Sequence, residues 1–230
     1  AIIQKITGQT LLDYLTPRLF APLGIEDMDW EVDPKGICVG GWGLRLKTED
    51  IAKFGQLYLQ EGTWNGKQII PRNWIKEATL AHIMQTGKEE DREKNDWLQG
   101  YGYQFWRCQH NAYRGDGAYG QYCIVLPDSD MVIVITSETP NMQVVLDQVW
   151  KYLVVPTSTE KMAIETASQK LVNQRLKDLS LPLPKGLVTS KSSFKIHKKQ
   201  YLLQENNLGI SAISFDTSVA NTIAFTVADR

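Results

Sequence analysis

The 230-residue sequence lacks long apolar runs and contains only three cysteines. No run approaches the ~18 apolar residues of a transmembrane helix, so we expect no membrane span in this chain. The cysteines are too few and too scattered for a disulfide framework: Cys38, Cys108 and Cys123. The histidines lack the paired spacing of metal ligands: His82, His110 and His197. We therefore predict buried free thiols, and neither a metal nor another cofactor.

The sequence also lacks an excess of charge of either sign. Its 25 Lys and Arg residues balance 26 Asp and Glu residues, giving a formal net charge of −1. This balance provides no general field that would recruit nucleic acid or an anionic membrane. Hydrophobic residues make up 43% and charged residues 22% of the chain, which predicts one large or two small globular domains. Oligomeric state does not follow from these numbers.

Helical periodicity marks the first part of the chain. Residues 1–8 resemble the back half of an amphipathic helix closed by a glycine, so we expect a segment to precede them. Apolar residues predict a helix from Gln9 to Leu23, with Thr10 or Asp13 serving its first turn. A further helix is expected to begin with Thr48 as its N-cap and to end near Gly62.

Strand and turn signals follow. Asn65-Gly66 predicts a hairpin turn, and Pro71 occupies a plausible first helical position. Residues 88–94 are rich in charge and predict an exposed loop. Three β-type runs and a closing helix come next: strands 100–106, 120–126 and 131–136, and helix 142–155. The last two strands are expected to be adjacent and antiparallel.

Composition shifts at Pro156, and we divide the chain there into residues 1–155 and 156–230. The first part predicts an α/β (α+β) domain with an antiparallel sheet flanked by helices. The second predicts a linker helix and a small β-rich accessory module: helix 161–179 and strands 194–203, 208–215 and 223–227. Three strands are too few to close on themselves, so this module is expected to be incomplete or to lean on the first domain.

Three ordered motifs in the first part carry a family resemblance. Residues 40–57, GGWGLRLKTEDIAKFGQL, contain a double glycine, Thr-Glu, an aliphatic residue, Ala and Lys-Phe. Residues 62–71, GTWNGKQIIP, have the form of a glycine-bounded hairpin ending in proline, and residues 100–106 read GYGYQFW. In this order they resemble the serine β-lactamase-like and penicillin-binding-protein superfamily, particularly class C β-lactamase-related hydrolases, in its C-terminal part only.

The resemblance implies a site at residues 113–122, where the family places a Lys-Thr-Gly or His-x-Gly triplet on the strand that edges the active site. Glycine there admits substrate, and a backbone N–H can complete an oxyanion hole. The implied oxyanion and substrate wall comprises Gly115, Asp116, Gly117, Ala118 and Tyr119. In one register Gly115 and Asp116 replace the usual Lys or His and Thr, and a one-residue shift puts Asp116 first. Both registers depart from penicillin-recognising members.

Three further residues are candidates for substrate binding. Arg114 could pair with Asp116, or its planar fork could bind a substrate carboxylate. Trp42 lies in the glycine-rich turn that, by resemblance, faces the active site. His110 precedes the triplet strand and could line the cleft. Incidental or packing roles stand beside these interpretations, and Asp116 could equally be a plain turn residue between two glycines.

The family's nucleophile and base motifs are missing. The catalytic serine belongs to Ser-x-x-Lys, and a second motif is Tyr-x-Asn or Ser-x-Asn; both precede the part of the fold recognised here. No Tyr-x-Asn or Ser-x-Asn occurs in the 230 residues. Two Ser-x-x-Lys strings, Ser158–Lys161 and Ser192–Lys195, follow the triplet. We interpret them as a helix-capping segment and the beginning of a strand.

The resemblance therefore implies a fragment of a metal-free serine hydrolase that forms an acyl-enzyme on an ester, amide or D-peptide. The complete enzyme would take a small-molecule or peptide substrate, whereas this chain alone is expected to be inactive. A non-catalytic peptide- or glycan-binding module using the same groove is the alternative. The resemblance also implies an extracytoplasmic, periplasmic location for the parent protein.

Overall fold

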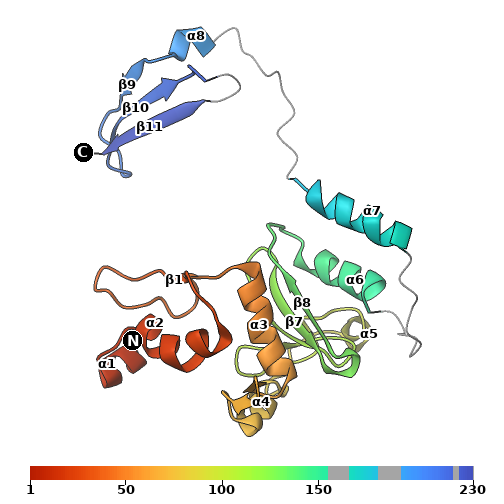
Figure 1. Ribbon diagram of the computed structural model, residues 1–230. Coiled ribbons are helices and arrows are strands. Elements are labelled where there is room, and N and C mark those ends of the chain that lie inside the picture. The colour runs from red at the N-terminus through yellow and green to blue at the C-terminus, as the bar shows by residue number, and fades with distance from the viewer. Residues whose placement is uncertain (155–165, 181–192, 220–222, 230) are drawn as a thin grey trace. The chain divides into compact units, whose positions relative to one another are not determined.

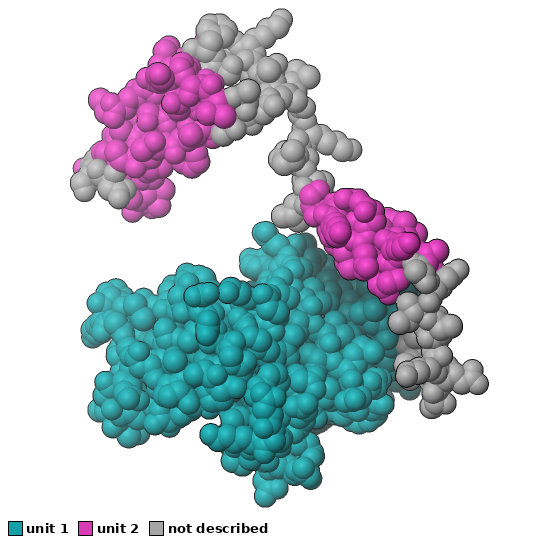
Figure 2. Space-filling view, in the orientation of Figure 1, with its two compact units in different colours: residues 1–161 teal, residues 162–230 magenta. Residues whose placement is uncertain are grey.

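The computed structural model describes residues 1–154, 166–180, 193–219 and 223–229. Contacts divide the chain into two compact units, Ala1–Lys161 and Met162–Arg230, which are coloured separately in Figure 2. The boundary predicted at residue 156 stays a prediction, because residues 155–165 lie outside the described ranges. The described helices include none that is long and apolar enough to cross a membrane.

Unit 1 begins with short helices of changing type. Gly8 closes the first of them in the left-handed conformation, and the Thr10 side chain accepts a hydrogen bond from the Asp13 N–H. The helix predicted over 9–23 is divided because Pro17 lacks the N–H that an α-helix would use there. The elements are α1 Ile2–Thr7, α2 Leu11–Leu15, the π-helical η1 Thr16–Phe20 and the 3-10 helix η2 Ala21–Leu23.

Two small hairpins and three helices follow. Thr48 is the first residue of its helix, and Lys47 is the N-cap, so the predicted Thr48 cap was wrong by one residue. Asn65 and Gly66 both have positive φ, at 46° and 77°, as the predicted tight turn requires. Pro71 is likewise the N-cap, one residue before its predicted position. The elements are β1 Asp29–Trp30, β2 Leu44–Arg45, α3 Thr48–Leu59, β3 Thr63–Trp64, β4 Lys67–Gln68, α4 Arg72–Ala78 and α5 Glu89–Arg92.

A four-stranded antiparallel sheet forms the centre of unit 1, in the order β5-β6-β7-β8. The strand predicted over 100–106 shrinks to two residues, because Gly102 donates its N–H to Phe105 and Gln104 takes a positive φ in a turn. The predicted antiparallel pairing of the last two strands is confirmed. The elements are β5 Trp106–Arg107, β6 Tyr113–Gly117, β7 Gln121–Leu126, the 3-10 turn η3 Pro127–Ser129, β8 Met131–Ile135 and α6 Met142–Tyr152.

Helices cover this sheet on both faces. Helix α3 approaches one face so closely that a Cβ on Gly55 would lie 2.6 Å from Val132 Cγ1. Helix α6 buries Leu146 and Val149 against Tyr122 and Ile124 on the other face. Figure 1 shows α3 and α6 beside β7 and β8. The mixed α/β architecture with a helix-flanked antiparallel sheet is therefore confirmed.

Unit 2 contains helix α7, the helical turn α8 and a three-stranded antiparallel sheet in the order β11-β10-β9. The strand predicted from residue 194 instead starts with the helical turn, and only its second half is extended. The elements are α7 Thr166–Lys177, α8 Ser193–Ile196, β9 Gln200–Leu202, β10 Ile210–Asp216 and β11 Ala224–Asp229. Residues 181–192, including Ser192, lie outside the described ranges, as does Ser158.

Candidate functional site

Strand β6 carries the predicted wall, and half of its length is open on one side. Tyr113 and Arg114 pair with β5. Gly115, Asp116 and Gly117 pair with β7 but have no strand partner on the β5 side among the described residues. The sheet therefore presents an unpaired backbone edge where a ligand could approach β6.

The direction of the backbone groups along this edge follows from the hydrogen-bond pattern. Cys108 donates its N–H to Ala112 O at 2.9 Å, which marks a hydrogen-bonded pair. Such pairs alternate with non-hydrogen-bonded ones in an antiparallel ladder. The backbone groups of Arg114 therefore point to β5 and those of Gly115 point to β7. The N–H and C=O of Asp116 point to the open edge.

Gly115 leaves the side-chain position beside this edge empty. A Cβ at Gly115 would meet no heavy atom within 4 Å. A Cβ at Gly117 would lie 3.3 Å from Gln121 Cβ, a tight contact. Strand side chains alternate between faces, so Gly115 lies on the same face as Tyr113, which packs beside Tyr58 of α3. The edge and the vacant position thus belong to the α3 side of the sheet.

The turn after β6 is held in place by a neighbouring segment. Tyr119 and Gly120 take positive φ values of 66° and 88° between Ala118 and β7. The Tyr119 carbonyl accepts hydrogen bonds from the Thr139 N–H at 3.0 Å and the Ser137 hydroxyl at 3.2 Å. The Tyr119 side chain itself is 60% exposed. The turn therefore has a fixed backbone and a freely exposed phenol.

Arg114 and Asp116 point to the opposite, α6 side of the sheet. Arg114 is fully buried, and its Nε donates to Asp116 Oδ2 at 2.9 Å. The predicted pairing of these residues is confirmed. The predicted contact of Arg114 with a substrate carboxylate does not fit this placement, because the guanidinium is enclosed. Burial raises the pKa of Asp116 above its usual range, and Arg114 opposes that shift.

Aromatic rings and backbone carbonyls complete the surroundings of Arg114. Its guanidinium lies 4.6 Å from the centroid of the Trp97 ring, and Nη1 donates to Asp96 O at 3.1 Å. Nη2 has no hydrogen-bond partner among the described residues. Five donors in a fixed fork are difficult to satisfy in a closed space. The arginine therefore serves the packing of this layer.

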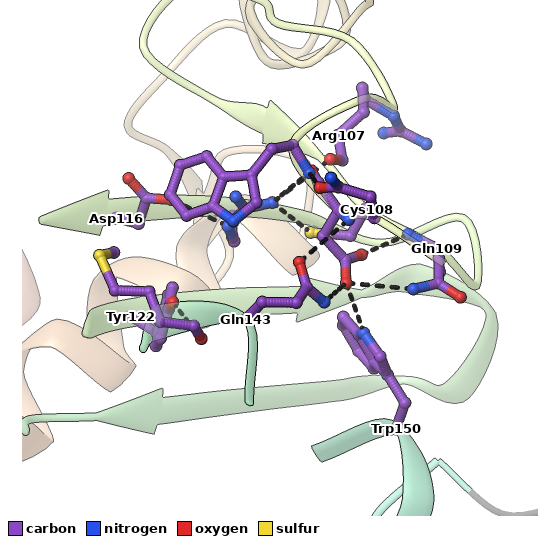
Figure 3. Close-up of polar contacts among 12 residues, drawn as sticks. Arg107, Cys108, Gln109, Asp116, Tyr122, Gln143 and Trp150 are labelled. Atoms are coloured by element: carbon purple, nitrogen blue, oxygen red, sulfur yellow. Dashed lines mark hydrogen bonds and ion pairs between the residues drawn. The ribbon is translucent and has the colours of Figure 1, made fainter. Parts of the chain in front are cut away.

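Asp96 is a buried carboxylate that sequence reasoning missed. Its Oδ2 accepts from Trp150 Nε1 at 2.8 Å and Gln143 Nε2 at 2.8 Å, and its Oδ1 accepts from the Gln109 N–H at 2.8 Å. Figure 3 shows Gln109, Gln143 and Trp150 converging on one carboxylate. The three donors lie 13 to 54 residues away in sequence, so no local pattern could have revealed the cluster. It joins α6 to the loops beside β5.

The other two predicted residues lie away from the open edge. His110 occupies the turn between β5 and β6, at the Tyr113 end of β6 rather than the Gly117 end, and its ring contacts Trp150. The prediction that it lines the cleft does not fit this position. Trp42 is 70% exposed in the loop between β1 and β2, and its carbonyl accepts from Trp30 Nε1. No hydrogen bond or ring contact of the described residues links it to β6.

The described residues contain no cluster of three or more His, Cys, Asp or Glu side chains that could hold a metal ion. Cys108 and Cys38 are buried, and Cys123 is partly buried. All three are free thiols, as predicted. Burial raises the pKa of Cys108 to about 11, which disfavours a thiolate nucleophile near neutral pH. What remains for chemistry on β6 is its backbone edge.

Comparison with known proteins gives a consistent match over unit 1. A family model described as Beta-lactamase matches residues 1–153. A 6-aminohexanoate-dimer hydrolase of Paenarthrobacter ureafaciens is 26% identical over 144 residues, which is 61% of this chain and 36% of the relative. A Bacillus anthracis structure, provisionally named 6-aminohexanoate-dimer hydrolase, is 27% identical with a TM-score of 0.54. That match covers 68% of this chain and 42% of the other.

A penicillin-binding-protein homologue from Caulobacter crescentus is similar at 15% identity and a TM-score of 0.44, over 60% of this chain and 49% of its own length. The chain spans 36% of the curated relative and 42% of the Bacillus anthracis structure. The relatives therefore contain a large part that has no counterpart in these 230 residues.

Proposed function

The protein belongs to the Beta-lactamase family, and from this membership we propose that its first unit supplies the glycine-edged wall of a serine hydrolase active site. The hydrolase-like domain extends over residues 1–153. The observation that carries the proposal is the open backbone edge at Gly115–Gly117, with a vacant side-chain position at Gly115. A substrate carbonyl can reach backbone N–H groups only where a strand is unpaired and no side chain intervenes.

The proposed reaction is acyl transfer to water. A serine hydroxyl adds to the carbonyl carbon of an ester or amide while a base takes its proton, and the carbonyl electron pair moves onto oxygen. Backbone N–H groups of β6 and the turn after it stabilise that oxyanion. The alcohol or amine then leaves with a proton, and water hydrolyses the acyl-enzyme to release the acid.

Neither the nucleophile nor its base is among the described residues of β6 or its neighbours. We propose that both come from a Ser-x-x-Lys and Tyr-x-Asn region outside these 230 residues, in line with the share of each relative that the chain spans. The chain alone is then inactive toward ester, amide and D-peptide substrates. No observation favours the alternative of a non-catalytic binding module.

For the substrate of the complete protein, we propose a linear amide ahead of a β-lactam. The two relatives above 25% identity carry the name 6-aminohexanoate-dimer hydrolase. Gly115 leaves no cation at the first position of the triplet, where penicillin-recognising relatives place Lys or His. A β-lactam carboxylate therefore loses a charged partner at that position.

The decisive experiment labels an activated serine. A fluorophosphonate probe and a chromogenic ester are offered to the 230-residue chain and to the protein encoded by the complete reading frame. We expect labelling and turnover only with the complete protein, at a serine of an upstream Ser-x-x-Lys. Turnover by the 230-residue chain that Ser158→Ala or Ser192→Ala abolishes would overturn the proposal, as would a complete reading frame that lacks the upstream motifs.

A second measurement tests the wall itself in the complete protein. Gly115→Val places a branched side chain over the open edge, so we expect kcat/KM for the ester to fall about tenfold or more. The unfolding midpoint should stay close to that of the parent, because the position is vacant. Unchanged kcat/KM in a folded Gly115→Val protein contradicts the assignment of this edge.

A further inference from the structure

An apolar groove of about 620 Å³ opens on unit 1, lined by residues of α2, η1 and the segment that joins β4 to α4. Its apolar lining includes Leu15, Leu19, Ile70, Pro71 and Trp74. Trp74 is half exposed, so part of its indole faces solvent beside the groove. A volume of this size falls in the range of small-molecule sites. None of the lining residues belongs to β6 or to the turn that follows it.

A second, smaller cavity continues the groove into the core. It has a volume of about 160 Å³ and an entirely apolar lining that includes Phe20, Ile25 and Phe54. Leu15 and Leu19 line both spaces, so these two side chains separate them. Rotation of two leucine side chains would connect the groove to the cavity. The joined space is narrow and offers no polar partner at its deep end.

Arg18 is the one charged side chain in the lining of the groove. Its guanidinium lies 4.0 Å from the centroid of the Tyr14 ring, and Nη1 donates to Tyr14 O at 2.8 Å. No other hydrogen bond or ion pair of Arg18 occurs among the described residues. The contact with Tyr14 holds the cation at the rim while its remaining N–H groups stay available. A planar guanidinium so placed suits a single carboxylate.

The segment that carries Arg18 and Leu19 is π-helical, Thr16–Phe20. Such turns are rare, and they occur frequently at functional sites. Here the π-helical turn brings the cation and the two leucines to one rim of the same groove. The helix irregularity and the single charge therefore coincide.

We propose that this groove binds a single-chain amphiphile with one terminal carboxylate, of the fatty-acid class. The carboxylate pairs with Arg18, and the unbranched chain lies along Leu15, Leu19 and Trp74 toward the deeper cavity. A linear chain fits because the deep end is narrow and wholly apolar, and one carboxylate fits because the rim holds one cation. This site is separate from the proposed hydrolase wall on β6 and does not depend on it.

Calorimetric titration of the 230-residue chain with dodecanoate, below its micellar concentration, tests the proposal. We expect saturable binding at one site per chain, and weaker binding of dodecyltrimethylammonium, whose cation faces Arg18. Arg18→Gln should weaken dodecanoate binding about tenfold or more while changing dodecan-1-ol binding less than about twofold. The matched control Arg175→Gln removes an exposed arginine of α7 and should change neither.

A second variant addresses the apolar part of the site. Leu19→Trp fills the groove with a larger side chain and should abolish binding of dodecanoate and dodecan-1-ol alike, with far-UV circular dichroism confirming the fold. Equal affinity for dodecanoate and dodecyltrimethylammonium, or an Arg18→Gln protein that binds dodecanoate unchanged, overturns the proposal. So does absence of saturable binding, or a concentration-dependent dimer that Leu19→Arg dissociates, since a second copy would then occupy the groove.

Discussion

Arg114 and Asp116 form a buried ion pair across one residue of β6, with Nε and Oδ2 2.9 Å apart, while Gly115 between them faces the other side of the sheet. The two charged side chains are 0% and 10% exposed. One face of the strand is therefore fixed to the α6 layer, and the other presents glycine and an open backbone edge. The strand is anchored from behind by the residues that sequence inspection had placed at the front.

Breaking this pair should be costly. Asp116→Ala leaves the Arg114 guanidinium buried without its charge partner, so we expect the free energy of unfolding to fall by roughly 3 to 5 kcal/mol. The control Asp29→Ala removes the partner of Arg45 in a pair whose side chains are 65% and 63% exposed, which should cost less than about 1 kcal/mol. Urea unfolding of both variants measures the difference. Equal losses would show that the buried pair has no special role.

The raised pKa of Asp116 predicts a pH dependence. A carboxyl group whose folded pKa exceeds its unfolded value contributes stability at low pH, and that contribution is lost as pH rises through the folded pKa. The parent should therefore lose stability relative to Asp116→Asn as pH rises from about 4. Urea unfolding of both proteins at several pH values measures this difference. A difference that grows in favour of the parent with rising pH would contradict the inferred direction of the shift.

Two glycines that look alike in sequence should respond differently to substitution. Gly115→Ala adds a methyl group where no heavy atom lies within 4 Å, so it should stay within about 1 kcal/mol of the parent or gain stability. Gly102→Ala places its Cβ 2.2 Å from Ala78 O and should destabilise by roughly 1 to 3 kcal/mol or more. Thermal unfolding midpoints of the pair give the comparison. A similar loss in both variants is incompatible with an open position at Gly115.

Removing the Asp96 carboxylate should loosen α6. Asp96→Ala leaves the Trp150, Gln143 and Gln109 donors without their acceptor, at about 1 to 3 kcal/mol for a buried unpaired group. The near-ultraviolet circular dichroism of Trp150 should change as well. The exposed Asp178 accepts one hydrogen bond, from Gln174, and Asp178→Ala should cost less than about 0.5 kcal/mol. Unchanged stability of Asp96→Ala would rule out a joining role for this residue.

The buried thiol of Cys108 should be inert in the folded protein. Its pKa near 11 and its burial leave little accessible thiolate at pH 8, so an aromatic disulfide reagent should modify it only as fast as the protein unfolds. Ser180→Cys adds an exposed thiol as a matched control, which should react orders of magnitude faster. Mass mapping of the labelled peptides identifies each site. Rapid native labelling of Cys108 contradicts the described burial.

Local signals in the sequence determined much of the fold. The Thr10 side chain caps α2, Asn65-Gly66 forms a tight turn, and the apolar alternation after Gly120 gives two adjacent antiparallel strands. Each depends on a few consecutive residues with defined backbone preferences. The ordered motifs also sufficed for the family, because they lie close together along the chain.

Tertiary structure alone decided which face each residue of β6 presents. Glycines at 115 and 117 interrupt the apolar alternation, so the sequence could not show that Arg114 and Asp116 point away from the open edge. Asp96 could not be found either, because its donors come from distant segments. Local propensity fixes an element, whereas its register and the contacts between elements depend on how distant surfaces pack.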